Sequence, residues 1–591
     1  MAHLRKTKIV CSMGPAIENL STIKDMLNAG MNVARFNFSH GDHAEHGERV
    51  KLVRQASAET GIPVALLLDT KGPEIRTGKL AGGKKLNLEI GHKMILTTEE
   101  IEGDADRISI SYKALPGEVG PGTHVFIADG LIDLEVEKVD GGEIYCVVRN
   151  GGELGSRKNV NVPGVKTSLP AITDKDREDI EYGIKNGFDY IAASFIRKPD
   201  DVLEIQQILT DHDSHIRIIA KIEDQEGLDN IDEIIRVAGG VMVARGDLGV
   251  QLRFEEIPLA QKRIIAKCNR HNKPVITATQ MLDSMINNPN PTRAELTDVA
   301  NAIFDGTDAV MLSGETANGK YPVKSVETMD RIALAVEQSA DYKKLCEQYF
   351  FSMREVSSDI GHAVAKSSFL VARDIDATAI VTPTLRGNTP RLLSKFRPLQ
   401  RIIAVTTDEQ AQRQLLLNWG VFPILTEYVR DSDLMIQNAL RESLKHKYIK
   451  KLDKVVTAAG IPLNSPIPMN TIKVHFMGNI LNRGQNALGG STAGPIVKAE
   501  SPEQAAVSLK QDGTEILLTR VLTEAFAHVI PNIRGVVIEE GSQIAREELV
   551  KLNSDLVVIA EVPEAFQQFE EGLYVSLDGD EKIIYEGVVE A

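Results

Sequence analysis

The residues of this chain that are best suited to chemistry begin with the run Ile218–Glu223, which reads IIAKIE. Successive side chains of a β-strand point to opposite faces, so Lys221 and Glu223 are expected on the same face. An ammonium and a carboxylate side by side form either a structural ion pair or part of a charged active site. The rest of the sequence has to decide between these two interpretations.

Other apolar runs of the chain end in the same way. Each carries a polar or charged residue at or near its C-terminal end, and these residues are Asn37, Ser39, Asp69, Ser194, Arg245, Asp247, Thr279 and Glu315. The runs alternate with helical patterns, and there are about eight of them, the number that closes a parallel α/β barrel. In such barrels the chemistry takes place at the C-terminal ends of the strands. The sequence therefore predicts a (β/α)8 TIM barrel with a charged mouth.

Two helices of the predicted barrel carry clear boundary signals. The first is expected to begin at Ser21 as N-cap and to end at Gly30. A later helix has Thr292 and Glu295 in capping-box spacing, followed by apolar residues on one stripe.

Length and composition describe a globular protein of several domains, with 591 residues, 42% hydrophobic and 25% charged. The net charge of −16 argues against partners such as nucleic acid or a membrane surface, because both require a basic face. No apolar run approaches the ~20 residues of a membrane span. The cysteines are far apart and form no CxxC pair, so we expect reduced thiols and a cytoplasmic location.

The pattern of runs predicts four domains. The barrel is expected at residues 1–70 and 171–345. It is interrupted at residues 71–170 by Gly-rich alternating runs, which predict a small inserted β-barrel domain able to move as a lid. An open α/β domain is expected at 346–477. The final region, 484–591, has strand-like runs but no group of titratable residues with catalytic spacing.

The polar residues of the predicted mouth suit a metal-assisted reaction on an anionic substrate. Glu223 and Asp247 follow adjacent strands, and two carboxylates with waters and substrate oxygens suit Mg2+. Arg35, Arg76 and Lys221 add positive charge, which fits a phosphorylated or carboxylated substrate. From the residues alone, phosphoryl transfer and enolate chemistry both remain open.

Two further sets of residues are suited to binding ions. A second, weaker cation fits the oxygens of Asn37, Ser39, Asp69 and Thr70. In the α/β domain, a hydroxyl-rich loop opens a helix, where free amides favour an anion. The loop residues are Thr382, Thr384, Arg386, Gly387, Asn388 and Thr389. The same pattern fits an ordinary βα turn equally well.

Taken together, the motifs of the barrel resemble those of the pyruvate kinase family. They read RFNFSHG from Arg35, LDTKGPEIR from Leu68, AKIE from Ala220, ARGDLG from Ala244 and ATQML from Ala278, and the block from Asn287 through SGET at 313–316 fits the same pattern. They extend over the whole barrel, so their joint specificity is very high. The resemblance implies a barrel with a lid and a C-terminal effector domain. It also implies transfer of phosphate from phosphoenolpyruvate to ADP, a step of glycolysis.

The resemblance implies a role for each matching residue. Lys221 would stabilise the phosphoryl group in transfer, Arg35 would bind the substrate phosphate, and Thr279 would contact the substrate near the water path that protonates enolpyruvate. The amides around Gly246 and Asp247 would bind the substrate carboxylate. The remaining implied ligands are Asn37, His40, Arg76 and Lys158 for the nucleotide, Glu223 and Asp247 for Mg2+ (or Mn2+), and Asn37, Ser39, Asp69 and Thr70 for K+.

Glu74 bears on the second cation. In the family that the sequence resembles, Glu at this position goes with K+ dependence and Lys with its absence. An acidic residue leaves the site short of one positive charge, which the ion supplies.

Two departures from the family pattern concern the C-terminal half. The loop at 382–389 resembles the family's sugar-phosphate effector loop, but Arg386 stands where Ser is usual, which leaves open whether the loop binds a sugar phosphate, a nucleotide or no effector. The final region resembles the swivelling phosphohistidine domain of phosphoenolpyruvate-using enzymes, but Arg546 occupies the histidine position. We therefore expect a structural or regulatory role for it. A homotetramer is implied by the resemblance alone.

Two other functions are compatible with parts of this pattern. A magnesium-dependent lyase acting through a pyruvate enolate would share the carboxylate pair, but it has no need of Lys221 with Arg76 and a nucleotide lid. A non-catalytic sensor of sugar phosphates is disfavoured because Lys221, Glu223, Asp247 and Thr279 are all present.

Overall fold

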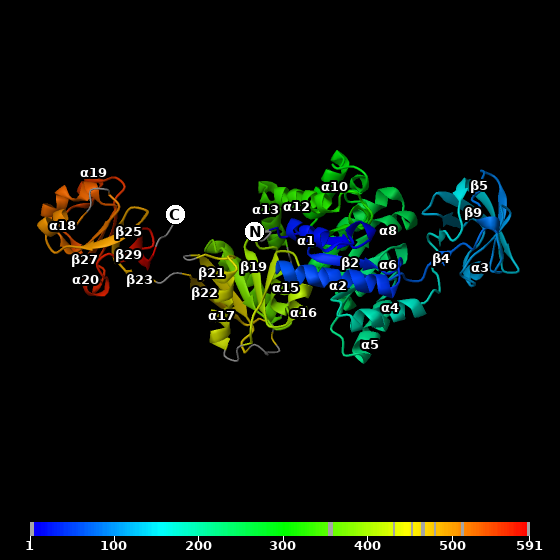
Figure 1. Ribbon diagram of the computed structural model, residues 1–591, viewed down its shortest axis with the longest axis horizontal. Helices are drawn as coiled ribbons and strands as arrows, with labels where there is room; N and C mark the ends of the chain where they lie inside the picture. Colours follow the sequence, from blue (N-terminus) through cyan, green and yellow to red (C-terminus); the bar gives the residue numbers. More distant parts are fainter. Residues whose placement is uncertain are drawn as a thin grey trace. The chain divides into compact units, whose positions relative to one another are not determined.

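The computed structural model describes residues 5–352, 359–428, 432–450, 453–462, 467, 469–477, 480–509 and 513–587. They form two compact units, of which the first contains the barrel and the second the final sheet (Figure 1). Within these residues, no helix combines the length and the apolar character that crossing a membrane requires.

Eight parallel strands close into a barrel in the order β1-β17-β16-β15-β14-β13-β3-β2, which confirms the predicted barrel. Their bounds are β1 Lys8–Ser12, β2 Val33–Asn37, β3 Ala65–Asp69, β13 Tyr190–Ala193, β14 Arg217–Ile222, β15 Gly240–Ala244, β16 Val275–Ala278 and β17 Ala309–Leu312. These strands are buried on both sides, as expected for a parallel sheet covered by helices.

The side chains of each strand alternate between two apolar clusters. Ile219 belongs to the cluster inside the barrel, whereas Ile218 and Ala220 belong to the cluster between strands and helices. The interior cluster is closed by Leu416 and Leu417, which come from the α/β region. Because the alternation continues along each strand, the next inward position of β14 is Lys221.

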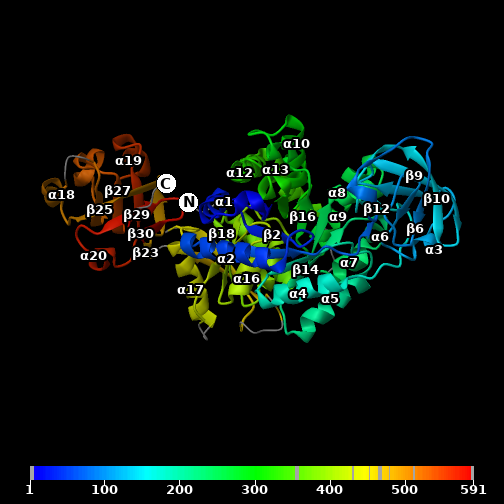
Figure 2. The ribbon, with the colours of Figure 1, turned by 45° about the vertical axis from the view of Figure 1, so that its right-hand side comes forward.

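Helices cover the outside of the barrel (Figure 2). Their bounds are α1 Leu20–Ala29, α2 His43–Thr60, α4 Asp174–Lys185, α5 Pro199–Asp211, α6 Gln225–Asp229, α7 Ile231–Val237, α8 Arg245–Gln251, α9 Ile257–Arg270, α10 Arg293–Phe304, α11 Gly314–Ala317, α12 Pro322–Gln338 and α13 Ala340–Ser352. Thr292 and Glu295 form the predicted capping box of α10. The predicted N-cap Ser21 is wrong. The cap is Asn19, whose side chain accepts the N–H of Thr22, because an Asn two residues earlier meets the same orphan amides.

The insertion between β3 and β13 is a mainly antiparallel domain, in which only the β6–β7 pairing is parallel. Its larger sheet has the order β4-β12-β8-β9-β10-β6-β7, and a second pairing joins β11 to β5. The bounds are β4 Ile75–Arg76, β5 Leu86–Leu88, β6 Lys93–Thr97, β7 Arg107–Ser109, α3 Leu115–Glu118, β8 His124–Ile127, β9 Ile132–Asp140, β10 Glu143–Asn150, β11 Gly152–Leu154 and β12 Asn159–Asn161. An isolated bridge between Thr77 and Ile110 links the two edges, so the sheet curls back on itself.

The α/β region that follows contains a five-stranded sheet in the order β20-β19-β18-β21-β22. Its elements are α14 Ile360–Asp374, β18 Ala379–Pro383, α15 Asn388–Ser394, β19 Arg401–Thr406, α16 Glu409–Leu415, β20 Val421–Leu425, α17 Ser432–Lys445, β21 Lys454–Ala459 and β22 Thr471–Phe476. At the amino ends of the barrel strands, the hydroxyl of Tyr190 donates to the carbonyl of Gln414, and the ammonium of Lys8 donates to the carbonyl of Val421.

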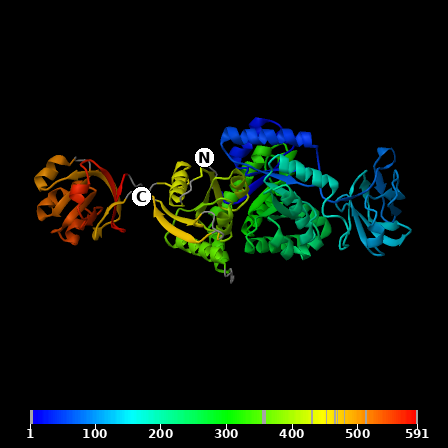
Figure 3. The same cartoon turned by 90° about the horizontal axis from the view of Figure 1, so that it is seen from below.

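The last unit is coloured orange to red in Figure 3. It is built on an eight-stranded mixed sheet in the order β23-β30-β29-β25-β26-β27-β28-β24. Its elements are β23 Ile480–Arg483, β24 Asn486–Leu488, β25 Ser491–Lys498, α18 Pro502–Ser508, β26 Ile516–Leu522, β27 Gly535–Ser542, α19 Arg546–Leu552, β28 Val557–Ala560, α20 Ala565–Gln568, β29 Tyr574–Asp578 and β30 Ile583–Glu586. Leu517 and Val536 pack on one face, and Ile516 and Val537 pack on the other. The unit therefore has an apolar core on each side of its sheet.

The interior packing of the barrel can be tested by Ile219→Ala. Ile219 is fully buried inside the barrel, so truncation should lower the free energy of unfolding by about 2–5 kcal/mol. Urea denaturation followed by circular dichroism measures the change. Leu203→Ala, at a half-exposed leucine of α5, is the control and should cost much less. Equal losses in the two variants would contradict the packing described here.

Candidate active site

A polar layer lies above the apolar interior of the barrel. Ser12, Arg35, Asp69 and Lys221 each follow an inward-facing residue by two positions, so they point into the barrel as well. Arg35 joins three strands, because its Nε donates to Asp69 Oδ2 at 2.6 Å and its Nη1 donates to Ser12 Oγ at 2.7 Å. Four different strands thus meet in one network of charges.

Lys221 is the centre of this network. It is only 8% exposed, and its Nζ lies 3.0 Å from Asp69 Oδ1 and 2.9 Å from Glu223 Oε1. Nζ also donates to Ser194 Oγ at 2.6 Å. The second oxygen of Glu223 accepts the backbone N–H of Phe195 at 2.6 Å. The predicted pairing of Lys221 and Glu223 on one face is therefore confirmed, and each group is held in place by further partners.

The charges of the network shift the pKa of its members. Burial alone would lower the pKa of Lys221, but the charges of Asp69, Glu223 and Asp247 outweigh it and hold this pKa above its usual value. Burial would raise the pKa of Asp69, yet the charges of Arg35 and Lys221 hold it below the usual range. Lys221 is therefore a fixed positive charge, and Asp69 a fixed negative one.

Glu223 behaves differently from Asp69. Burial, reinforced by the charge of Asp247, raises the pKa of Glu223 to about 8 in spite of the adjacent Lys221. Asp247 lies on α8 and is exposed. The charge of Asp247 therefore favours the protonated form of Glu223 when no cation is bound.

Helix α8 is braced against the end of β16. The guanidinium of Arg245 donates to the carbonyl of Ala278 at 3.1 Å, to the carbonyl of Thr279 at 2.6 Å and to Asp298 at 2.7 Å. Thr279 has a φ of +67°, a strained backbone conformation for a β-branched residue. Its Oγ1 accepts the amide N–H of Gly246 at 2.8 Å. The brace therefore aims the hydroxyl of Thr279 at the start of α8.

The four residues predicted to bind a second cation lie on adjacent strands. Asn37 and Asp69 are direct partners in the β2–β3 pairing, and Ser39 and Thr70 follow those strands. Asn37 Oδ1 accepts the N–H of Ser39 at 3.1 Å, and Thr70 Oγ1 accepts the N–H of Ser194 at 3.1 Å. In the part of the chain that the structure describes, no group of three or more His, Cys, Asp or Glu side chains is arranged to hold a metal.

The residues predicted to bind the nucleotide come from two places. Arg76 is on β4 of the insertion, where its Nε donates to Glu74 at 2.7 Å and its Nη1 donates to the carbonyl of Arg157 at 3.1 Å. Lys158 lies next to Arg76, because its carbonyl accepts the N–H of Thr77, the residue that follows Arg76. His40 follows β2 and has an exposed side chain.

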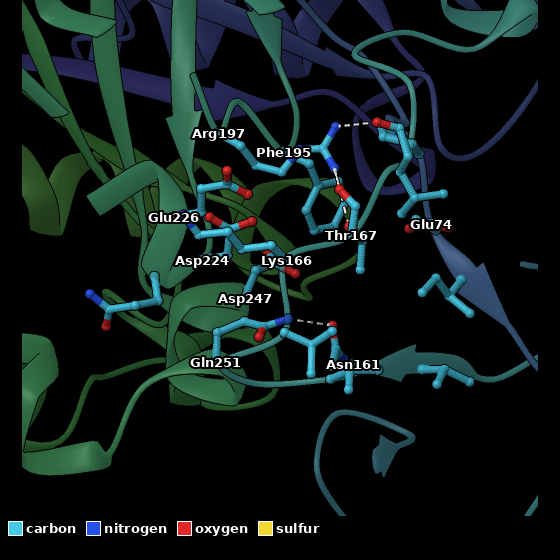
Figure 4. Close-up of a pocket in the computed structure, with 18 of the residues that line it drawn as sticks. Glu74, Asn161, Lys166, Thr167, Phe195, Arg197, Asp224, Glu226, Asp247 and Gln251 are labelled. Carbon is cyan, nitrogen blue, oxygen red and sulfur yellow. Dashed lines mark hydrogen bonds between the residues drawn. The ribbon is translucent and has the colours of Figure 1, made fainter. Parts of the chain in front are cut away.

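A cavity of about 170 Å3 lies between the insertion and the barrel (Figure 4). Among its lining residues, Asp247 and Glu74 belong to the chemistry described above, whereas Lys221 and Thr279 do not line it. Gln251 of α8 donates to Asn161 of β12 at 3.1 Å across this cavity (Figure 4). The cavity therefore borders the charged network and does not contain it.

Most residues of the loop at 382–389 are buried. Thr382, Thr384, Gly387 and Thr389 are buried, and Thr384 Oγ1 accepts the N–H of Gly387 at 3.0 Å. Among the predicted effector residues, only the side chains of Arg386 and Asn388 are exposed. In the last unit, Arg546 is the first residue of α19.

Several residues of the network were not singled out from the sequence. Ser12 was not singled out at all, and Ser194 was noted only as a polar strand end, although both are bound by cations of the network. The inward alternation of β1 and β13 was the signal available for them. Glu315, noted in the same way, accepts the N–H groups of Leu282 and Ser313, so it braces two loops.

The raised pKa of Glu223 has a consequence for stability. Without a divalent cation, the folded chain holds the Glu223 proton up to about pH 8, whereas the unfolded chain releases it near the usual 4.5. Between these values the folded state binds more protons, so this group makes stability fall as the pH rises. Thermal denaturation in EDTA should show a flatter pH dependence for Glu223→Gln. Glu255→Gln, at an exposed glutamate, is the control. An unchanged slope in Glu223→Gln would contradict the assignment.

Comparison with known proteins identifies the family. The model for the pyruvate kinase barrel domain matches residues 4–326, and that for the pyruvate kinase alpha/beta domain matches residues 362–475. A pyruvate kinase of Geobacillus stearothermophilus is 47% identical and one of Bacillus licheniformis is 44% identical, each over 99% of both chains.

A solved structure agrees with these matches. The crystal structure of a pyruvate kinase from Cryptosporidium parvum aligns with a TM-score of 0.77 and 42% identity, covering 80% of this chain and 96% of that one. The motifs predicted from the sequence, the closed barrel and these matches agree. The chain belongs to the pyruvate kinase family of phosphotransferases.

Proposed function

We propose that the charged network of the barrel mouth carries out the pyruvate kinase reaction, in which the phosphoryl group of phosphoenolpyruvate passes to ADP and gives pyruvate and ATP. The observation that carries this proposal is the buried ammonium of Lys221, held between Asp69 and Glu223 at the mouth. In this reaction the bond between phosphorus and the enol oxygen breaks. A terminal oxygen of ADP forms the new bond, and the enolate takes up a proton at carbon.

Lys221 acts as a permanent positive charge in this step. Its raised pKa keeps it protonated, so it cannot serve as a base. Negative charge spreads over the equatorial oxygens of the phosphoryl group during transfer, and a fixed ammonium stabilises it without reorganisation. Arg35 adds a second cation, oriented toward the same region by Asp69 and Ser12.

Glu223 and Asp247 are the residues that would hold Mg2+ or Mn2+. Their donor set fits, because both side chains are carboxylic acids and a hard cation prefers oxygen ligands. When bound, a divalent cation supplies positive charge for the substrate oxygens. Because the ligand form of Glu223 is the carboxylate, binding at neutral pH displaces the proton that its raised pKa retains.

Thr279 and the start of α8 are suited to the carboxylate of the substrate. The amide of Gly246 donates to Thr279 Oγ1, so a bound carboxylate would take this N–H over from the hydroxyl. The hydroxyl proton of Thr279 is donated to the carbonyl of Ala278 at 2.7 Å, and it is this proton that would pass toward the enolate. The strained backbone of Thr279 fits a residue whose position has to be set accurately.

Nucleotide binding is assigned to Asn37, His40, Arg76 and Lys158, of which the last two come from the insertion. Closure of the insertion over the mouth would bring their charges to the phosphates of ADP. We assign residues 1–70 and 171–345 to catalysis and 71–170 to this lid.

K+ is assigned to Asn37, Ser39, Asp69 and Thr70. Of these, Asn37 Oδ1 and Thr70 Oγ1 each accept one backbone N–H and retain a second lone pair. Glu74 neutralises Arg76 through a contact of 2.7 Å, which leaves the mouth with less positive charge. The ion restores that charge.

The C-terminal half is assigned to regulation. Residues 346–477 would bind an effector and support a homotetramer, with Arg386 and Asn388 as the exposed residues available to a sugar phosphate or a nucleotide. Residues 484–591 would serve a structural or regulatory role, because Arg546 stands where a phosphohistidine would be required.

The first test is pyruvate formation from phosphoenolpyruvate and ADP with Mg2+, with and without K+. Turnover should require K+ and ADP, and Lys221→Ala should lower kcat by at least ~100-fold. Lys185→Ala, at an exposed lysine of α4, is the control. An inactive wild type, tried also with sugar phosphates and AMP, would reject the proposal, and turnover without ADP would favour a lyase.

A second test concerns the charge of Glu74. Glu74→Lys replaces the carboxylate beside Arg76 with an ammonium, so the variant should keep most of its activity when K+ is replaced by tetramethylammonium. The matched control is Glu153→Lys, which also removes a lid glutamate that pairs with a lysine. Activity ratios with and without K+ measure the effect. Equal K+ dependence in Glu74→Lys and wild type would show that this charge is irrelevant.

A further inference from the structure

The segment Ser194–Arg197, between β13 and α5, contacts both connections of the lid as well as the charged network. We call it the pivot segment. It was noted in the sequence only because Ser194 ends an apolar run. Phe195 within it has a φ of +55°, which is unusual for an aromatic residue and marks a locally strained backbone.

On the mouth side, the pivot segment holds both charges of the central pair. Ser194 Oγ accepts Lys221 Nζ at 2.6 Å, and the N–H of Phe195 donates to Glu223 Oε2 at 2.6 Å. Ser194 Oγ in turn donates to the carbonyl of Thr70 at 2.7 Å. Thr70 is the last residue before the insertion. A shift of this segment would therefore move partners of Lys221 and Glu223 together.

The incoming connection of the lid packs directly on the pivot segment. Gly72 has a φ of +72°, and a Cβ at this position would lie 2.8 Å from the Cβ of Ser194 and 2.9 Å from Cδ2 of Phe195. Only glycine fits in this space. The chain that enters the lid is thus in close contact with the residues that bind Lys221 and Glu223.

The outgoing connection is held by Arg197, which is only 6% exposed. Its Nη1 donates to the carbonyl and to the hydroxyl of Thr167, both at 3.2 Å (Figure 4). Its Nη2 donates to the carbonyls of Leu169 at 2.6 Å and Pro170 at 3.1 Å. One planar guanidinium therefore fixes four oxygen atoms of the segment that returns from the lid.

The backbone of Arg197 is anchored to the barrel at the same time. Its N–H donates to Asp201 Oδ2 at 2.8 Å, and its carbonyl accepts from Asn230 Nδ2 at 2.8 Å. The side chain thus holds the lid while the main chain is held by α5 and by the turn before α7. Within the part of the chain that the structure describes, Arg197 joins the lid through its side chain to the barrel through its backbone.

We propose that Arg197 is a positioning residue that couples the placement of the lid to the orientation of Lys221 and Glu223 through the pivot segment. The proposal rests on the function proposed above. When the lid moves, the Thr167–Pro170 segment displaces the guanidinium of Arg197. The backbone of the pivot segment adjusts in response, and this shifts Ser194 and Phe195. Lys221 and Glu223 then reach their working geometry in the lid position that the nucleotide selects.

The test is Arg197→Lys in the full chain, with Arg54→Lys as matched control. Arg54 also donates to two backbone carbonyls, those of Val64 and Gly187, but these lie at the amino ends of the strands. A lysine keeps the charge but cannot bind four oxygens at once. Hydrogen exchange of residues 165–171 and 194–197 and the steady-state constants are measured for both variants.

In Arg197→Lys, exchange should rise in both segments, and kcat should fall by about tenfold or more while KM for phosphoenolpyruvate stays within about threefold. Arg54→Lys should change none of these. Arg197→Ala should recover part of its kcat with ethylguanidinium, because Arg197 lines a cavity that a small cation can enter.

Two results would overturn the proposal. One is faster exchange at 165–171 with unchanged exchange at 194–197 and unchanged kcat, since Arg197 would then anchor the lid and nothing more. The other is unchanged exchange in both segments. If Arg197→Lys does not fold, Thr167→Val removes one acceptor and should give a weaker form of the same pattern. If wild type makes no pyruvate, the proposed function fails, whereas the exchange of the two segments still decides the coupling.

Discussion

The structure depends on keeping an ammonium charged inside a protein barrel. Burial of Lys221 is tolerable only because Asp69 and Glu223 lie within about 3 Å of it, and each of these carboxylates needs partners of its own. Asp69 accepts a hydrogen bond from Arg35, and Glu223 accepts one from the backbone N–H of Phe195. The apolar layers beneath exclude water from the network, which strengthens every contact within it.

This constraint links parts of the chain that are far apart in sequence. Asp69 ends β3, and Thr70, the residue between it and the insertion, accepts from Ser194 of the pivot segment, which also binds Lys221. A group that holds Lys221 therefore also holds a connection of the lid. On the other side, Arg245 fixes Thr279 and the start of α8 by three hydrogen bonds. The loops of the barrel mouth therefore share hydrogen-bond partners, so a displacement of one loop alters the hydrogen bonds of the others.

Much of this was predictable from the sequence, and the limits have physical reasons. Strand alternation predicted that Lys221 and Glu223 share a face, and the spacing of eight runs predicted the closed barrel. Short-range patterns do not report which strands become neighbours, so the bonds of Ser12 to Arg35 and of Ser194 to Lys221 were not foreseen. The N-cap at Asn19 was missed because Ser21 offers a similar hydroxyl two residues later. Burial of Thr382 and Thr384 depends on the packing of a βα turn, which composition does not encode.

The floor of the barrel has a consequence for how this fold can be divided. Leu416 and Leu417 complete the interior cluster from outside the barrel sequence, and the carbonyl of Gln414 accepts the hydroxyl of Tyr190 at the foot of β13. A fragment that ends after the last barrel helix would leave apolar side chains and a buried hydroxyl open to water. The stretch of sequence that forms the barrel strands and helices therefore does not contain the whole apolar interior of the barrel. An exchange of barrels between relatives would have to carry the segment 414–417 with it, and residues at the floor are expected to vary together across that distance in the chain.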